Sequence, residues 1–204
     1  MRLTDRFNDE LLYNGVKLKL SFSFDNVLRG YELLNDNLFN SIEKVHILCD
    51  MFVTNHDEIE LSLEDKNKIV KYIFENYLND NSENGSVPSS GGKRYLDITQ
   101  DSRYIYASFM QDYNIDLFEM QGKLHWYKFL ALLDGLSDKT KLKEVISIRQ
   151  QEIPKPDKYN AKERQRIINL KRVYRLDGDN VSLQSADNAM SAYSESLKRA
   201  SKRN

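Results

Sequence analysis

Apolar and polar side chains alternate near the start of the chain, a pattern that predicts a β-strand with one solvated face. The apolar positions are Val16, Leu18, Leu20 and Phe22, and Lys17, Lys19 and Ser21 lie between them. Directly before this run, the dipeptide Asn14-Gly15 tolerates the two positive φ angles of a type I′ turn. The pattern therefore predicts an N-terminal β-hairpin. We expect its apolar face to lie on helices, because an isolated hairpin is only marginally stable in water.

Three helices are predicted after the hairpin, because apolar residues recur there three and four positions apart. Ser23 or Asp25 is expected to cap the first helix. Ser41 is expected to cap the second helix and Ser62 the third. The apolar faces comprise Val27, Leu28, Tyr31 and Leu34 in the first helix, Ile42, Val45, Cys49 and Phe52 in the second, and Ile69, Tyr72, Ile73 and Tyr77 in the third.

A polar run at residues 79–93 separates these helices from the rest of the chain. It is rich in Asn, Ser and Gly and predicts a flexible loop. Beyond it, Thr99 or Asp101 precedes a helix rich in aromatic residues. A second helix is predicted from about residue 122 to 134, with Gly135 ending it in the left-handed conformation. The apolar positions are Tyr104, Ile105, Tyr106, Phe109 and Tyr113 in one helix, and Trp126, Phe129, Leu130 and Leu133 in the other.

Two more helices complete the prediction. Ser137 is expected to begin one, which should end before Pro154 because proline lacks a backbone N–H and clashes with the preceding turn. Asn160 and Glu163 resemble a capping box, which predicts a last helix through Tyr174. The chain is therefore expected to be mainly α, a compact helical domain of about six to seven helices with an N-terminal β-hairpin.

The domain organisation follows from chain length, because 204 residues suffice for one well-packed core. We expect a single domain over residues 1–176, containing the loop at 79–93. Residues 177–204 are rich in serine and predict a flexible or partner-dependent tail. That tail has a weak apolar stripe of Ala186, Met190, Tyr193 and Leu197.

The amino-acid composition argues against several classes of protein. Apolar residues make up 40% of the chain, which is enough to fold. The 30 basic and 31 acidic residues nearly cancel, so no global field favours nucleic acid or an anionic membrane. No apolar run is long enough to span a membrane, and the N-terminus lacks the apolar segment of a signal peptide, so we expect the protein in the cytoplasm.

The sequence predicts no catalytic, cofactor-binding or metal site. The histidines His46, His56 and His125 lie on different predicted elements and outside any metal-binding spacing. Cys49 lies on an apolar helix face, where a thiol acts as a small hydrophobic group. Gly91-Gly92-Lys93 lacks the first glycine and the preceding strand of a phosphate-binding loop. We therefore expect the chain not to be an enzyme.

A basic segment departs from the balanced charge of the whole chain. Between residues 155 and 175 there are eight basic residues and two acidic ones. On a helix whose other face carries Ile167, Leu170 and Tyr174, these charges form a basic face. It could bind an acidic protein segment or a phosphate backbone, or it could be a solvated face. The candidate partner-binding residues are Lys162, Arg166, Lys171, Arg172 and Arg175, with Met190, Tyr193 and Leu197 of the tail.

Five segments of the sequence resemble a known phage family. They are residues 1–7 (MRLTDRF), 21–29 (SFSFDNVLR), 104–113 (YIYASFMQDY), 121–130 (QGKLHWYKFL) and 149–154 (RQQEIP). The family comprises small tail proteins of long-tailed phages and prophages of Gram-positive bacteria, encoded between the major tail protein and the tape measure protein. The resemblance extends over about residues 1–175 and is to tail assembly chaperones.

This resemblance implies a non-enzymatic function in the bacterial host cytoplasm. The chaperone would coat the tape measure protein, keep it soluble and bring the major tail protein to it, with self-association of many copies along the rod. No cofactor and no membrane are implied. Two other classes stay open: a structural tail or head–tail joining component of the virion, and, as the weaker alternative, a nucleic-acid-binding accessory protein acting through the basic segment.

Overall fold

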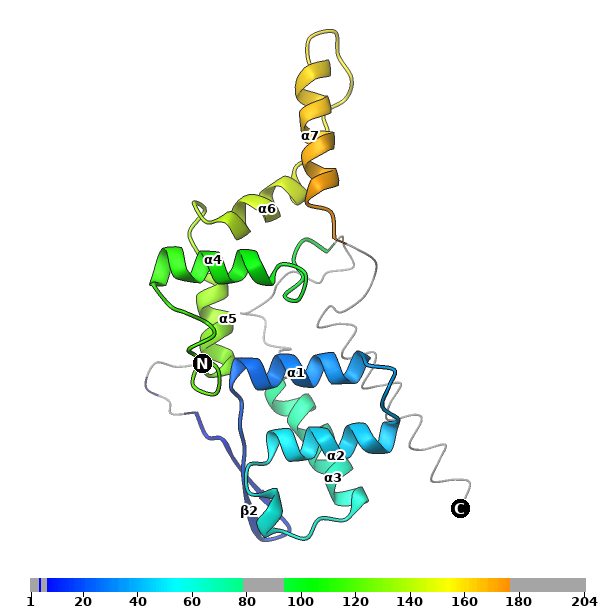
Figure 1. Cartoon of the computed structure of the whole chain (residues 1–204), viewed down its shortest axis with the longest axis vertical. Helices are drawn as coiled ribbons and strands as arrows, with labels where there is room; N and C mark the ends of the chain where they lie inside the picture. Colours follow the sequence, from blue (N-terminus) through cyan, green and yellow to red (C-terminus); the bar gives the residue numbers. More distant parts are fainter. Residues whose placement is uncertain (1–3, 5–6, 79–93, 177–204) are drawn as a thin grey trace. The chain divides into compact units, whose positions relative to one another are not determined.

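A computed structural model describes residue 4, residues 7–78 and residues 94–176 of the chain (Figure 1). These residues form seven α-helices after a two-stranded antiparallel hairpin, which confirms the predicted fold class. The elements in chain order are β1 (Glu10–Tyr13), β2 (Val16–Lys19), α1 (Phe24–Asn35), α2 (Ser41–Phe52), the 3₁₀ turn η1 (His56–Glu58), α3 (Leu63–Ile73), the π-helical turn η2 (Phe74–Leu78), α4 (Ser102–Tyr113), α5 (Trp126–Asp134), α6 (Lys141–Gln150) and α7 (Ala161–Val173).

The described residues group into two compact units. Unit 1 contains residue 4, residues 7–78 and residues 120–130, and unit 2 contains residues 94–119 and 131–176. The chain passes from unit 1 to unit 2 within α5. The predicted loop at 79–93 and the predicted tail at 177–204 lie outside the described residues. The single domain over 1–176 stays a prediction.

The hairpin of unit 1 forms as the alternating pattern predicts. Asn14 and Gly15 both have positive φ, 50° and 81°, so the turn has the expected type I′ signs. Leu18 is buried, and beyond the strand the Ser21 N–H donates to the Phe52 carbonyl at 2.9 Å. The chain after β2 is thus joined to the end of α2, which confirms that the hairpin does not stand alone.

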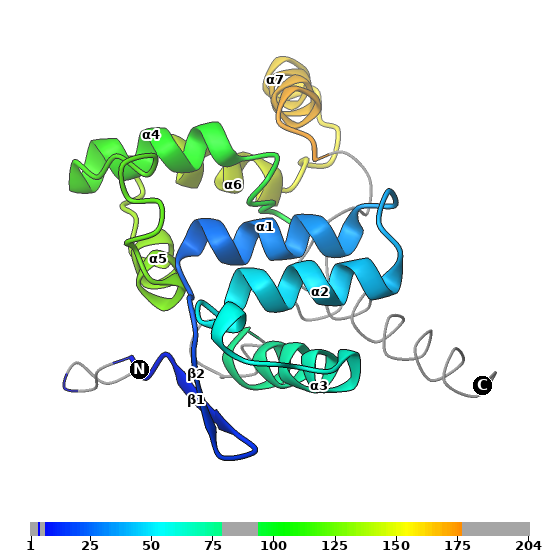
Figure 2. The same ribbon diagram turned by 60° about the horizontal axis from the view of Figure 1, so that its bottom comes forward.

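The helices of unit 1 pack around α2. Figure 2 shows α1 and α2 side by side with α3 beside them, and α2 packs against both. Residues 120–130 return to this unit: the Trp126 N–H donates to the Phe22 carbonyl at 2.7 Å, and the Phe24 N–H donates to the Leu124 carbonyl at 2.9 Å. The side chains of Trp126, Phe22 and Phe52 are buried. These aromatic residues form the centre of the core.

Helix caps in unit 1 match the prediction in part. Ser62 caps α3 in a capping box with Asp65, as expected for a serine at this position. The cap of α2 is Asn40 rather than Ser41, and Glu43 completes its capping box. Ser23 occupies the cap position of α1 but makes no capping bond through its side chain. The Asp25 carboxylate instead accepts from the Gly122 N–H at 2.8 Å.

In unit 2, α6 packs against both α4 and α7. Its core contains Ile105 and Phe109 from α4 and Leu142 and Val145 from α6. In Figure 1, α7 (orange) extends away from α4 and α6. No helix among the described residues is both long and apolar enough to cross a membrane.

Three helix starts or caps after the loop were predicted wrongly. Helix α5 begins at Trp126 rather than near residue 122, because Gly122 has φ 71° and lies in a turn. Helix α6 begins at Lys141, since the Ser137 N–H and hydroxyl donate to Asp112 at 2.7 and 3.1 Å instead of starting the helix. The capping box of α7 does not form.

The reason for the missing capping box lies in the partners of its two side chains. The Asn160 Oδ1 accepts from the Asp157 N–H at 2.9 Å, and Glu163 pairs with Arg166. Asn160 still occupies the cap position of α7. As predicted, the preceding helix α6 ends before Pro154.

Gly135 follows α5, but it is not in the left-handed conformation that the prediction gave it. A Cβ atom there would lie 3.2 Å from both the Tyr113 Oη and the Ala131 carbonyl oxygen. Close packing at the end of the helix, and not a positive φ, therefore explains why a glycine occupies position 135.

Candidate functional site

His56 and His125 have partners among the described residues, and Cys49 is buried. His125 stacks on Phe7 with ring centroids 3.9 Å apart, and its Nε2 lies 3.2 Å from an Asp9 carboxylate oxygen. Burial lowers the pKa of His125, and Asp9 partly opposes that shift. Burial raises the pKa of the Cys49 thiol to about 11. Within the part of the chain that the structure describes, no group of His, Cys, Asp and Glu side chains is arranged to hold a metal ion.

The basic segment forms a helix as predicted, and its charges divide into two groups. The first group has partners within unit 2: Arg164 donates to the Pro154 carbonyl at 3.1 Å, and the Lys171 ammonium donates to the Arg149 carbonyl at 2.7 Å. Arg166 makes two hydrogen bonds to Glu163, at 3.0 and 3.1 Å. Lys171 therefore holds α7 against α6 and contributes little charge to the outer surface.

The second group is exposed. Lys162, Arg172 and Arg175 form no ion pair with another described residue, and their side chains face solvent. Apolar side chains lie exposed beside them: Val173 is 73% exposed and Tyr159 is 93% exposed. The inner face of α7 has Ile167 buried. The outer face of α7 is thus a mixed basic and apolar surface on a helix anchored through its other side.

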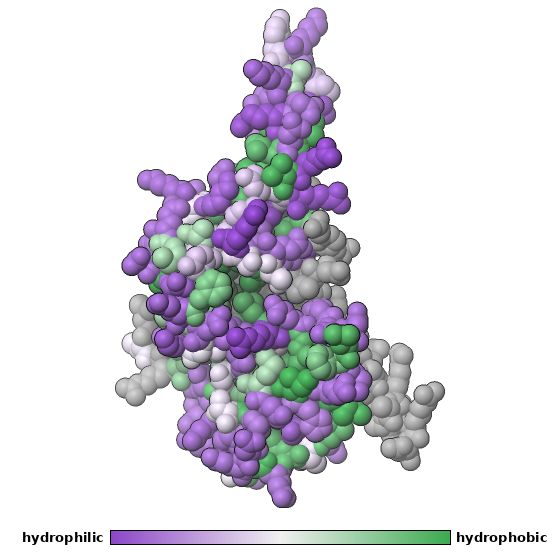
Figure 3. Space-filling view, viewed as in Figure 1, coloured by the Kyte–Doolittle hydropathy of each residue, from purple (hydrophilic) through white to green (hydrophobic). Residues whose placement is uncertain are grey.

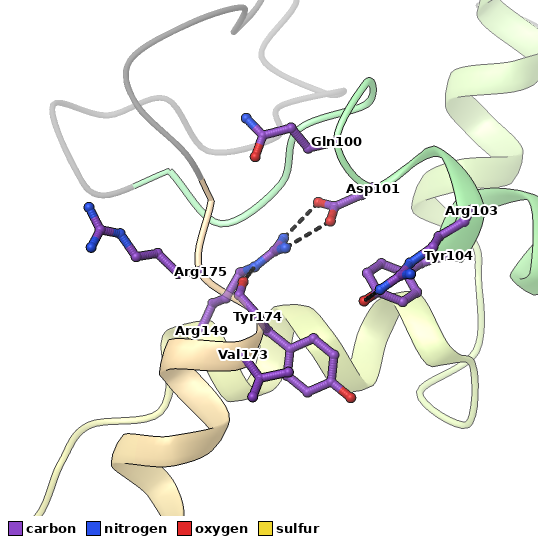
Figure 4. A pocket seen from close by; sticks show the side chains of 8 residues that line it. All are labelled: Gln100, Asp101, Arg103, Tyr104, Arg149, Val173, Tyr174 and Arg175. Carbon is purple, nitrogen blue, oxygen red and sulfur yellow. Dashed lines mark hydrogen bonds and ion pairs between the residues drawn. The ribbon is translucent and has the colours of Figure 1, made fainter.

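A buried ion pair anchors the C-terminal end of α7. The Arg149 guanidinium makes two hydrogen bonds to the Asp101 carboxylate, at 2.6 and 2.7 Å, as Figure 4 shows. Arg149 is 9% exposed and Asp101 is 1% exposed. The guanidinium also donates to the Tyr174 carbonyl at 2.6 Å and to the Tyr95 carbonyl at 2.8 Å. One side chain therefore joins α6, the segment before α4 and the end of α7.

A hollow of about 290 Å³ lies beside this ion pair. Its lining residues come from the start of α4, from α6 and from the end of α7, and are Gln100, Asp101, Arg103, Tyr104, Arg149, Val173, Tyr174 and Arg175. The rings of Tyr104 and Tyr174 meet edge to face, with centroids 6.1 Å apart. The Arg103 guanidinium lies 4.6 Å from the centre of the Tyr104 ring. The hollow is accordingly lined mainly by arginine and tyrosine side chains.

The structure separates the candidate residues that the sequence analysis grouped. Arg175 lines the hollow, whereas Lys162 and Arg166 lie in the first half of α7. Met190, Tyr193 and Leu197 lie outside the described residues. Of the residues that line the hollow, only Arg175 was a predicted candidate. The sequence did not predict the others as site residues: Gln100, Asp101, Arg103, Tyr104, Arg149, Val173 and Tyr174. The sequence signal for Tyr104 and Arg149 was their place within segments of family resemblance.

An exposed apolar cluster also occurs in unit 1. Leu38, Phe39 and Ile42, around the start of α2, are exposed large apolar residues. Figure 3 shows apolar side chains gathered on the face where α1 and α2 lie. Exposed apolar clusters of this kind mark contact surfaces more often than isolated apolar residues do.

In comparison with known proteins, the chain matches the family described as bacteriophage Gp15 protein over residues 7–176. No curated protein and no solved structure matches the chain. The matched range includes every described residue except residue 4, and so covers all seven described α-helices, the hollow and the basic helix. The chain therefore belongs to the bacteriophage Gp15 protein family, which confirms that it resembles phage proteins.

Proposed function

We propose that this phage protein is a non-enzymatic tail assembly chaperone that binds the tape measure protein in the host cytoplasm and helps to recruit the major tail protein. Membership of a phage family and the resemblance to tail proteins support this proposal. A chaperone for a long, aggregation-prone rod needs exposed surface that is partly apolar. It also needs a way for several copies to cover one rod.

The outer face of α7 is the observation that carries the proposal. The helix is anchored through Ile167 and Lys171 on its inner side, so its outer side chains are presented on a fixed backbone. That outer side combines Lys162 and Arg172 with the exposed apolar side chain of Val173. Such a face suits an amphipathic helix of opposite charge, because apolar contact supplies affinity while the charges set register.

Co-expression with the tape measure protein of the same phage genome tests the proposal. Affinity capture followed by size-exclusion chromatography should give a soluble complex of high mass, whereas the tape measure protein expressed alone should be insoluble. Replacing the two outer cations together, by Lys162→Gln and Arg172→Gln, should weaken capture by about tenfold or more.

A matched control removes the same number of charges elsewhere. Lys123 and Lys139 are exposed and their side chains form no ion pair with a described residue, so their replacement by Gln should leave capture unchanged. If the two proteins do not associate at all, the chaperone proposal fails. The protein should then be sought in purified virions by mass spectrometry, where a structural tail component would be present.

A further inference from the structure

The hollow beside the Arg149–Asp101 pair has an excess of positive charge. The carboxylates around it already form ion pairs: Asp97 pairs with Arg94 at 3.0 Å, and Asp101 pairs with Arg149. Glu144 pairs with Lys141 at 2.9 Å, and that lysine lies 4.9 Å from the centre of the Tyr174 ring. The arginines Arg103 and Arg175, which also line the hollow, form no ion pair with a described residue.

The two arginines lie on either side of the buried pair, as Figure 4 shows. Arg103 is held by its own neighbour, because its guanidinium donates to the Tyr104 hydroxyl and lies over the Tyr104 ring. The hydrogen bond to Tyr104 also raises the pKa of Arg103, so the group stays protonated. A guanidinium held in this way retains further N–H donors in a planar fork, which matches the two oxygens of a carboxylate.

We propose that this hollow binds a glutamate or aspartate side chain from an acidic helical segment of the protein partner. Arg103 donates to the incoming carboxylate from one side of the buried pair, and Arg175, on the other side, adds to the positive charge of the hollow. This inference rests on the proposed function, and it specifies the chemistry of the partner segment that binds near α7. The outer face of α7 contributes Arg172 and Val173 next to the hollow, so a helix that fills the hollow continues along α7.

A phosphate backbone fits this surface less well than a protein carboxylate. Affinity for nucleic acid grows with the number of phosphates that are neutralised along the strand. On α7, Arg164 and Lys171 donate to carbonyl oxygens of unit 2, and Arg166 pairs with Glu163. These interactions interrupt the row of exposed positive charge along the helix. The two tyrosine rings are also poor platforms for stacked bases, because Arg103 covers one ring and Lys141 lies over the other.

Direct binding measurements test the inference on the full chain. The probe is a fluorescein-labelled synthetic helical peptide of about 20 residues, built from Ala and Leu with Glu at every fourth position. Its partner probe has Gln at each Glu position, and a labelled thymidine 20-mer represents nucleic acid. The variants are Arg103→Gln with Arg175→Gln, and, as the matched control, Lys123→Gln with Lys139→Gln. All four side chains are exposed, so circular dichroism should show unchanged folding.

The expected result is selective binding of the Glu peptide, weakened about tenfold in the double arginine variant and unchanged in the double lysine control. Equal binding of the Glu and Gln peptides would overturn the inference, as would full retention of Glu-peptide binding by the arginine variant. Tighter binding of the thymidine 20-mer than of the Glu peptide, lost in the same arginine variant, would also overturn it, because the surface would then recognise phosphate.

Capture of the tape measure protein separates this inference from the proposed function. If the wild-type chain and the double arginine variant capture it equally, the chaperone proposal stands and the hollow is not the site. If the wild-type chain does not capture it, but Glu-peptide binding still depends on Arg103 and Arg175, the chaperone proposal fails while the carboxylate site stands.

Discussion

The buried pair of Arg149 and Asp101 supports the sharpest prediction about stability. The substitution Arg149→Met keeps most of the side-chain volume and removes the guanidinium. It leaves the Asp101 carboxylate, which is 1% exposed, without its charged partner. It also removes the donor that now reaches the carbonyl oxygens of Tyr95 and Tyr174. Breaking a buried pair by removing one partner costs about 3–5 kcal/mol.

The expected signal is large compared with the error of a thermal melt. For a chain of this length, each kcal/mol lowers Tm by about 2–4 °C, so Arg149→Met should lower it by about 6–20 °C. Calorimetry is the suitable assay, because two units need not unfold in one transition. Only the transition that contains unit 2 should move. If unit 2 unfolds in a transition of its own, its smaller size raises the expected shift to about 4–8 °C per kcal/mol.

The control replaces both partners. The double variant Arg149→Met and Asp101→Leu leaves no buried charge unpaired, and such replacements are often neutral or stabilising. It should therefore regain most of the lost stability. The part that stays lost is the contribution of the two hydrogen bonds from Arg149 to the carbonyl oxygens of Tyr95 and Tyr174. A single variant that melts within about 2 °C of the wild type would refute the reasoning. So would a double variant no more stable than the single one.

Three further predictions concern unit 1. The substitution Gly30→Ala should lower the free energy of unfolding by about 1 kcal/mol in urea, because its Cβ would lie 2.9 Å from the Phe52 Cζ and overpacking outweighs the gain in helix propensity. Native Cys49 should not react with iodoacetamide at pH 8, because it is fully buried and burial raises the pKa of its thiol to about 11; it should react in guanidinium chloride. Stability should fall as pH falls from about 7 to 5, because burial lowers the pKa of His125 in the folded state and the unfolded state then binds more protons. Replacing His125 by Phe should flatten that dependence.

Each of these predictions has a result that would contradict it. Gly30→Ala should become stabilising when Phe52→Leu removes the ring, and persistence of the loss in that background would show another cause. Alkylation of Cys49 in the native chain at the rate seen in denaturant would mean that α2 opens readily. The pH experiment fails if the wild type and the His125→Phe variant lose stability in parallel between pH 7 and 5.

Short-range patterns in the sequence predict the elements well, because their causes are local. The type I′ turn needs only the positive φ of Asn14 and Gly15. The helix of α7 follows from apolar spacing alone, even though its predicted capping box is absent. The boundaries of the helices depend less on local sequence. Asn40 caps α2 in place of Ser41, since either side chain can accept the bonds and only the path of the incoming chain decides between them.

Local sequence patterns also predict the basic helix, whereas the candidate site depends on tertiary structure. By itself, the sequence determined a mainly α chain with an N-terminal hairpin and a basic segment on its last described helix. Tertiary structure alone decided which of those charges remain exposed, because Lys171 binds the carbonyl of Arg149 whereas Arg175 stays exposed at the edge of the hollow. It also brought Arg149 to Asp101, 48 residues apart in the chain. No periodicity encodes such a contact, since it depends on how α4, α6 and α7 pack.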